Sequence, residues 1–166
     1  MIFYLVTPLI LIFASSLGLI INPSWSISPF IWVFVLVPII DLALPYLSKD
    51  DLELKESVFH NFSILIIFPC ILFLIIFGLI VVSDSSINLL TAAALGAAVG
   101  MSGGSIGITT AHELIHRKNK FMRGIGVLLL VLCCYGHFRI EHIYGHHLNV
   151  ATKEDPATAR RGENFY

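Results

Sequence analysis

Histidine is the residue type whose spacing in this sequence could support chemistry. Six of the seven histidines lie between positions 112 and 147. His112 and His116 stand four residues apart, so on a helix their imidazoles project about 40° apart and one turn along. His142 and His146 repeat this spacing, and His147 follows about 100° further round. Imidazole is the commonest metal ligand in proteins, and we therefore expect these five histidines to bind metal.

The number of histidines indicates how many ions are bound. A structural zinc takes four ligands, and a catalytic zinc takes three and a water. Five converging imidazoles exceed both sets, which favours two ions that could activate one O2 molecule between them. Because imidazole suits zinc, copper, iron and nickel, the ligand type alone leaves the metal open.

Two other classes of protein use paired histidines. The segment His112-Glu-Leu-Ile-His116 matches the HExxH helix of zinc metalloproteases, so an intramembrane zinc protease is an alternative. That enzyme needs one further ligand and leaves the second histidine group without a role. A haem-binding electron carrier is the third alternative, but it needs one histidine from each of two facing helices.

The elements that position these residues are predicted to be membrane helices. Hydrophobic residues make up 57% of the 166 residues and charged residues 13%, so lipid is the expected solvent. Four segments approach or exceed the roughly 20 apolar residues that cross a bilayer. They are Ile2 to Ile21, Pro29 to Leu47, Val58 to Val82, and Leu89 to about Thr110. The predicted fold class is all-α: a polytopic membrane helix bundle with four transmembrane helices in residues 1–110, then a cytoplasmic histidine-rich helical region in residues 111–166.

The basic residues predict the orientation. Four crossings place the loop 48–57 and everything after 110 on one side, and all ten Lys and Arg residues fall there. That side is cytoplasmic by the positive-inside rule. The apolar stretch Gly124 to Gly136 is predicted to be re-entrant or interfacial, because crossing would separate the two histidine groups. The formal net charge of −1 gives no electrostatic reason to expect nucleic acid as a partner.

Two groups of small residues, glycines in the fourth span and cysteines in apolar runs, bear on how the helices pack. Gly96, Gly100 and Gly104 give the fourth span one nearly bare face. This face predicts close helix packing, or an apolar passage for a long substrate, or both. The three cysteines lie inside apolar runs without CxxC spacing, which predicts packing: Cys70, Cys133 and Cys134.

Three segments together resemble the alkane 1-monooxygenase family. They are His112-Glu-Leu-Ile-His-Arg-Lys118, Tyr135-Gly-His-Phe-Arg-Ile-Glu-His-Ile-Tyr-Gly-His-His147 and Ala151-Thr-Lys-Glu-Asp-Pro-Ala-Thr-Ala159. The family's first two histidine boxes, HExxH and EHxxGHH, stand here with matching spacing, and the second is highly specific. The family is related to xylene monooxygenase and more distantly to membrane fatty-acid desaturases and hydroxylases, which stay open as alternatives.

The resemblance implies terminal hydroxylation of alkanes by O2 at two non-haem irons, with electrons delivered by rubredoxin. It assigns five histidines as iron ligands: His112, His116, His142, His146 and His147. Glu113 and Glu141 match motif positions and could orient imidazoles, with salt bridges or helix-terminus interactions as the alternative. His137 is predicted to support the site rather than bind metal, and His60 to be an interfacial residue.

The sequence departs from the family where it ends, at Tyr166. The family's third histidine box, its remaining ligands and its later membrane helices are absent. We therefore expect a fragment of a longer protein that alone binds metal incompletely and does not turn over.

Overall fold

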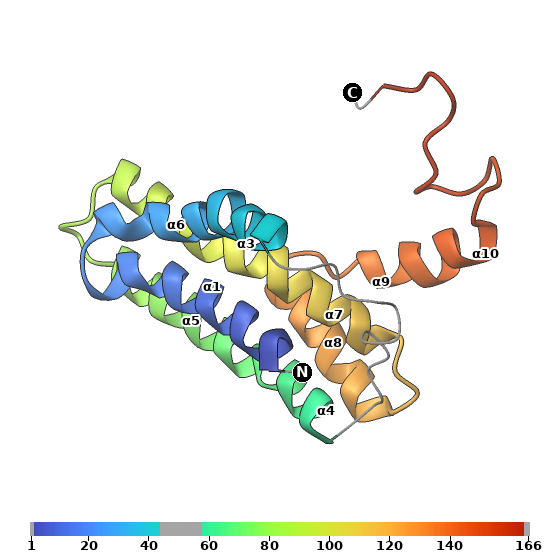
Figure 1. Cartoon of the computed structure of the whole chain (residues 1–166), viewed down its shortest axis with the longest axis horizontal. Coiled ribbons are helices and arrows are strands. Elements are labelled where there is room, and N and C mark those ends of the chain that lie inside the picture. Colours follow the sequence, from blue (N-terminus) through green and yellow to red (C-terminus); the bar gives the residue numbers. More distant parts are fainter. Residues whose placement is uncertain (1, 44–57, 165–166) are drawn as a thin grey trace.

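The computed structural model describes residues 2–43 and 58–164, with side chains from 6–43 and 61–164, and every regular element there is helical (Figure 1). The α-helices are α1 (Ile2–Ile20), α2 (Ser28–Ile31), α3 (Val37–Ala43), α4 (Val58–Leu65), α5 (Ile67–Val82), α6 (Leu89–Ser102), α7 (Ile108–Ile115), α8 (Lys120–Leu132), α9 (Phe138–Ile140) and α10 (His147–Asn149). A 3₁₀ turn covers Pro23–Ile27, and π-helical turns cover Trp32–Leu36, Gly103–Gly107 and Glu141–His146. The predicted all-α fold is confirmed.

Three continuous helices in the described residues are long and apolar enough to cross a membrane: Pro23–Ala43, Asn61–Val82 and Leu89–Ile115. The first predicted span corresponds to α1, whose described apolar part, Val6–Ile20, is shorter than a span. The chain is therefore an integral membrane protein, while the count of four crossings stays a prediction. The end of the second predicted span, residues 44–47, and the loop 48–57 lie outside the described residues.

The turn after α1 and the turn between α5 and α6 lie together at one end of the bundle, opposite α7 and α8 (Figure 1). Asn22 and Asn88 each begin the next helix by accepting a backbone hydrogen bond, from Ser24 and Thr91, both at 2.9 Å. Such caps satisfy amide groups that the first turn of a helix leaves unpaired. The chain therefore reverses at this end, and the histidine-bearing segments lie at the other.

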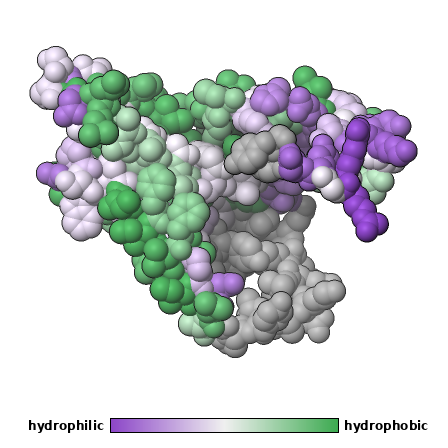
Figure 2. Space-filling view, turned by 90° about the horizontal axis from the view of Figure 1, so that it is seen from above, coloured by the Kyte–Doolittle hydropathy of each residue, from purple (hydrophilic) through white to green (hydrophobic). Residues whose placement is uncertain are grey.

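Polar contacts inside the bundle join α1 to α6. The hydroxyls of Ser15 and Ser102, both buried, are 2.8 Å apart, and Ser102 also donates to the carbonyl oxygen of Leu11 at 3.4 Å. Interhelical hydrogen bonds of this kind stabilise helix association in lipid, where apolar burial alone gives little preference between protein and lipid neighbours. Large apolar side chains such as Phe73 and Leu90 stay exposed on the bundle, where lipid would surround them. Figure 2 shows apolar side chains over the bundle and hydrophilic ones gathered toward the C-terminal segment.

The helix that carries the first histidines continues from the third described span. Residues 89–115 form one helix that passes through the π turn Gly103–Gly107, so the predicted boundary at 110 falls inside a continuous helix. The division into two parts stays a prediction. α8 then packs back along α7, and the buried core there is shared by three helices. Its residues are Ile67 and Ile71 of α5, Ala111 and Ile115 of α7, and Leu129 and Leu130 of α8.

α8 has 13 residues, too few to span a bilayer. After it the chain reverses at Cys134, whose φ is 55°, and returns through α9. Both histidine groups consequently lie at the same end of the bundle, as the re-entrant or interfacial interpretation requires. The three cysteines carry no disulfide.

Candidate metal centre

α7 presents its two histidines on the face that the bundle leaves open. Ala111, Leu114 and Ile115 are buried against the neighbouring helices, whereas His112 is half-buried and His116 is exposed. Their Nε2 atoms are 3.3 Å apart. The i, i+4 spacing therefore produces the predicted convergence of this pair.

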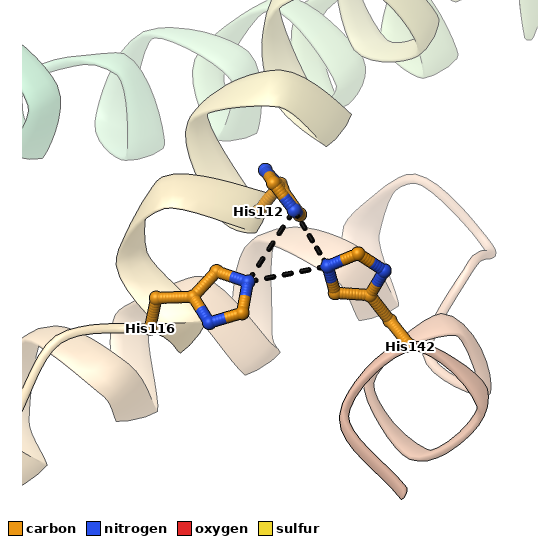
Figure 3. Close-up of side chains that lie close together, drawn as sticks. All are labelled: His112, His116 and His142. Carbon is orange, nitrogen blue, oxygen red and sulfur yellow. Dashed lines mark hydrogen bonds between the residues drawn. The ribbon is translucent and has the colours of Figure 1, made fainter. Parts of the chain in front are cut away.

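His142 reaches the same point from the returning segment. Its Nε2 atom lies 2.7 Å from Nε2 of His112 and 3.2 Å from Nε2 of His116 (Figure 3). The ligand nitrogens of these three residues all lie within 4.8 Å of one another. Histidines separated by some 30 positions in the sequence thus form one group suited to a metal ion.

The fourth nitrogen comes from His147 rather than from His146. Nε2 of His147 lies 3.0 Å from Nε2 of His142. The spacing predicted that His142 and His146 would pair, as on an α-helix, but Glu141–His146 is a π turn in which the backbone N–H of His147 bonds to the carbonyl of His142. Because π turns close i→i+5 hydrogen bonds, residues five apart are drawn to one side.

The distances fit a shared ion better than hydrogen bonds between the rings. One neutral imidazole nitrogen makes a single in-plane hydrogen bond, as donor or acceptor. Nε2 of His142 instead faces three other Nε2 atoms at 2.7 to 3.2 Å. Metal–nitrogen bonds of about 2.0–2.1 Å place two ligand nitrogens about 2.9 Å apart at a right angle and about 3.4 Å at the tetrahedral angle. The spacings of His112, His116 and His142 therefore fit one first-row metal ion, and His147 adds a fourth nitrogen beside His142.

His146 is turned toward a carboxylate that the sequence analysis did not single out. Its Nδ1–H donates to Asp155, with both carboxylate oxygens at 3.0 Å. Asp155 is buried and also accepts from the Thr158 hydroxyl and from the backbone N–H of Ala157 at 2.9 Å. The Thr158 hydroxyl, then the Ala157 amide and His146, hold the pKa of Asp155 well below its usual range against the effect of burial. A carboxylate on Nδ1 fixes the tautomer that leaves Nε2 free to bind metal.

His116 and His142 are poor proton acceptors. Desolvation, followed by the neighbouring histidines, lowers the pKa of His142 to about 4. Desolvation and then the charges of His112 and His147 also lower the pKa of His116, with Glu113 acting in the opposite direction. Both imidazoles are therefore neutral near pH 7, which is the form that binds metal.

The other polar residues singled out in the sequence lie outside this group. Glu113 forms an ion pair with Arg117 at 2.7 Å, the salt-bridge alternative of the sequence analysis. Glu141 is exposed. His137 is exposed and meets the ring of Tyr135 edge-on at a centroid distance of 4.7 Å. The side chain of His60 lies outside the described residues. Supporting roles for Glu113, His137 and Glu141 stay predictions.

Aromatic stacking orients His142 from behind. The ring of Phe138 stacks on His142 at a centroid distance of 4.8 Å and an interplanar angle of 17°, and Tyr135 stacks on Phe138 at 5.2 Å. One signal for this arrangement is present in the residue spacing, since Phe138 precedes His142 by one helical turn. Nothing in the spacing indicated the role of Asp155, which depends on the chain folding back.

Comparison with known proteins gives a family match over the same region. The family model for fatty acid desaturases matches residues 87–166. The chain is 30% identical to alkane 1-monooxygenase 2 of Pseudomonas aeruginosa over 90% of its own length and 44% of that protein. It is 31% identical to the alkane 1-monooxygenase of Acinetobacter baylyi over 80% of its length and 33% of that protein.

A shorter and more similar match covers the alkane 1-monooxygenase of Ectopseudomonas oleovorans, at 47% identity over 44% of this chain and 18% of that protein. The chain thus spans less than half the length of these relatives. No solved structure matches the chain.

Proposed function

We propose that this chain is a member of the alkane 1-monooxygenase family and supplies part of the metal centre of an integral-membrane monooxygenase that hydroxylates the terminal carbon of alkanes. The bound metal would be non-haem iron, which supplies the activation of O2. The chain's own residues hold the metal, orient its ligands and exclude water.

One observation carries this proposal. Nε2 of His142 lies within 3.2 Å of the Nε2 atoms of His112, His116 and His147. Three imidazole nitrogens around one point, with a fourth beside His142, have few sufficient partners other than a cation. A zinc protease built on HExxH needs one ligand beyond the first pair, so it accounts for His142 or His147 but not for both.

Two irons are proposed on the ligand count. The four converging nitrogens suffice for one ion. His146 points its Nδ1–H away, toward Asp155, and its Nε2 is then available to a second ion. That ion would need further ligands from outside the 166 residues.

The proposed substrate is an alkane that enters from the lipid. A terminal C–H offers no polar group, so affinity would come from burying methylenes at about 0.8 kcal/mol each. Within the described part of the chain, a Cβ added at Gly96, Gly100 or Gly104 meets no atom within 4 Å. This bare face of the helix that leads to His112 supports the apolar-passage interpretation over close packing inside this chain.

The proposed site faces the cytoplasm at a bacterial inner membrane, with rubredoxin as electron donor. Eight basic residues lie in the described segment after residue 116: Arg117, Lys118, Lys120, Arg123, Arg139, Lys153, Arg160 and Arg161. The turns between spans at the opposite end carry none. This asymmetry supports the orientation, and the basic end offers an acidic carrier a complementary surface.

Metal analysis of a purified protein tests the proposal. The protein should be the family member that contains this chain with its third histidine box, grown on ⁵⁷Fe and extracted in detergent. We expect about two irons per chain with coupled Mössbauer signals, and conversion of an alkane to the primary alcohol when rubredoxin and its reductase are supplied. One zinc per chain without iron would overturn the proposal and support the HExxH protease.

A further inference from the structure

α8 touches α7 through backbone at Gly126. A Cβ placed on Gly126 would lie 2.7 Å from Cβ of Leu114, 3.0 Å from the backbone nitrogen of Ile115 and 3.1 Å from the carbonyl oxygen of Ala111. Carbon atoms in contact stay about 3.5–4.0 Å apart, so only hydrogen fits there without movement of the backbone. All three atoms belong to the turns of α7 that carry the HExxH motif.

A second contact joins the end of α8 to the π turn before the first histidine. The thiol of Cys133 donates to the carbonyl oxygen of Gly103 at 3.3 Å, and a Cβ on Gly107 would lie 2.7 Å from its sulfur. A π turn contains one residue more than an α turn, so it rotates all that follows by about 100°. The thiol therefore lies at the turn that sets the direction of His112 and His116.

The same helix fixes where the second histidine group arrives. The chain reverses directly after Cys133. The ring of Phe138 then stacks on that of His142, with 4.8 Å between the ring centroids. α8 is thus a rigid spacer of 13 residues between the two histidine segments. A displacement of α8 along or away from α7 changes the distance between His116 and His142.

We propose that Gly126 and Cys133 are positioning residues of the metal centre, which together set the register of α8 on the HExxH helix and so the convergence of the two histidine groups. This inference rests on the proposed metal-binding function. It concerns the α7–α8 contact, which neither binds metal nor touches substrate.

The test measures Co²⁺ binding to the purified protein with its third histidine box in detergent, by affinity and by the intensity of the visible absorption bands that report nitrogen coordination. Gly126→Ala should weaken binding about tenfold or more and reduce the bands. Gly124→Ala is the matched control, because a Cβ there meets no atom within 4 Å. Both substitutions raise helix propensity equally, so the difference between them reports the contact.

A rescue keeps the proposal testable if Gly126→Ala does not fold. Gly107→Ala should weaken Co²⁺ binding through its contact with the Cys133 sulfur, and Gly104→Ala in the same π turn should not. Adding Cys133→Ala to Gly107→Ala should restore the affinity of Cys133→Ala alone. Such rescue is not expected from a general loss of stability.

The outcomes separate the two proposals. A wild-type protein with its third histidine box that binds no Co²⁺ would overturn the metal centre and this inference together. Binding by wild type, with Gly126→Ala and Gly107→Ala indistinguishable from their controls, would overturn the positioning roles and leave the metal centre standing. If adding Cys133→Ala does not restore the Co²⁺ affinity of Gly107→Ala, Cys133 is not a positioning residue.

Discussion

His146 and Asp155 form a bidentate contact, with Nδ1 of the imidazole 3.0 Å from each carboxylate oxygen. The contact ties the segment after α10 back onto the histidine helix, and Pro156 packs there against Gly145, with 3.3 Å between its Cγ and a Cβ placed on the glycine. Asp155 therefore orients a predicted ligand whose ring centroid lies 5.5 Å from that of His142 and 5.6 Å from that of His147.

Removing this carboxylate should weaken metal binding. Asp155→Ala leaves His146 free to rotate and to adopt the wrong tautomer, and loss of such a partner typically lowers metal affinity about 10- to 100-fold. Glu154→Ala is the control, because Glu154 is exposed and adjacent. Iron titration of the protein with its third histidine box checks this, and equal affinities for the two variants would refute the role of Asp155.

The π turn predicts which histidines share an ion. His147→Ala should remove one of the four converging nitrogens and weaken the tighter Co²⁺ site, as should substitution of His112, His116 or His142. His146→Ala should affect that site less. Lys153→Ala, at an exposed residue of the C-terminal segment, is the control. A stronger effect of His146→Ala than of His147→Ala would contradict the π-turn arrangement and favour α-helical pairing.

The lowered histidine pKa values predict how pH affects the metal-free protein. In the unfolded chain histidine titrates at about 6.5, whereas in the folded chain the pKa of His142 is about 4. The unfolded state therefore binds more protons, and the free energy of unfolding should fall as pH decreases from about 6.5 toward 4. Thermal melting in detergent over this range measures the effect, and His142→Gln should flatten the dependence. An unchanged slope in that variant would assign the effect to other groups.

The buried hydroxyl pair between α1 and α6 should contribute measurably to the stability of the bundle. Ser102→Ala removes the bonds to Ser15 and to the carbonyl of Leu11, and we expect a loss of about 0.6 kcal/mol in the free energy of unfolding, as for other interhelical hydrogen bonds in membranes. Ser16→Ala is the control, since the Ser16 hydroxyl bonds only within its own helix, to Phe13 at 2.7 Å. Steric trapping or denaturant unfolding in detergent would compare the free energies of unfolding of the two variants. Equal values would show that the Ser15–Ser102 hydrogen bond does not stabilise the bundle.

Sequence reasoning predicted what depends on composition and periodicity. Apolar runs predicted the membrane helices, and the i, i+4 spacing of His112 and His116 predicted a converging pair. Those patterns hold because burial in lipid and helical geometry are local properties of the chain.

The remaining features depend on non-local packing. The π turn at Glu141–His146 brings His147 rather than His146 to the other ligand nitrogens, and residue spacing does not indicate such a turn. Asp155 becomes a partner of His146 only after the chain folds back, and Gly126 is distinguished from Gly124 only by the approach of α7. For Glu113 the sequence allowed either orientation of an imidazole or a salt bridge. The structure shows a salt bridge, formed with Arg117.

X-ray absorption at the metal edge of the iron-loaded protein tests the central claim most directly. Convergence of His112, His116, His142 and His147 predicts a shell of nitrogen scatterers at about 2.0–2.1 Å, with the outer-shell pattern of several imidazoles. His142→Ala should reduce that pattern, and Lys153→Ala, at an exposed residue of the C-terminal segment, should leave it intact. A shell dominated by oxygen, without imidazole scattering, would contradict a histidine-bound metal centre in this chain.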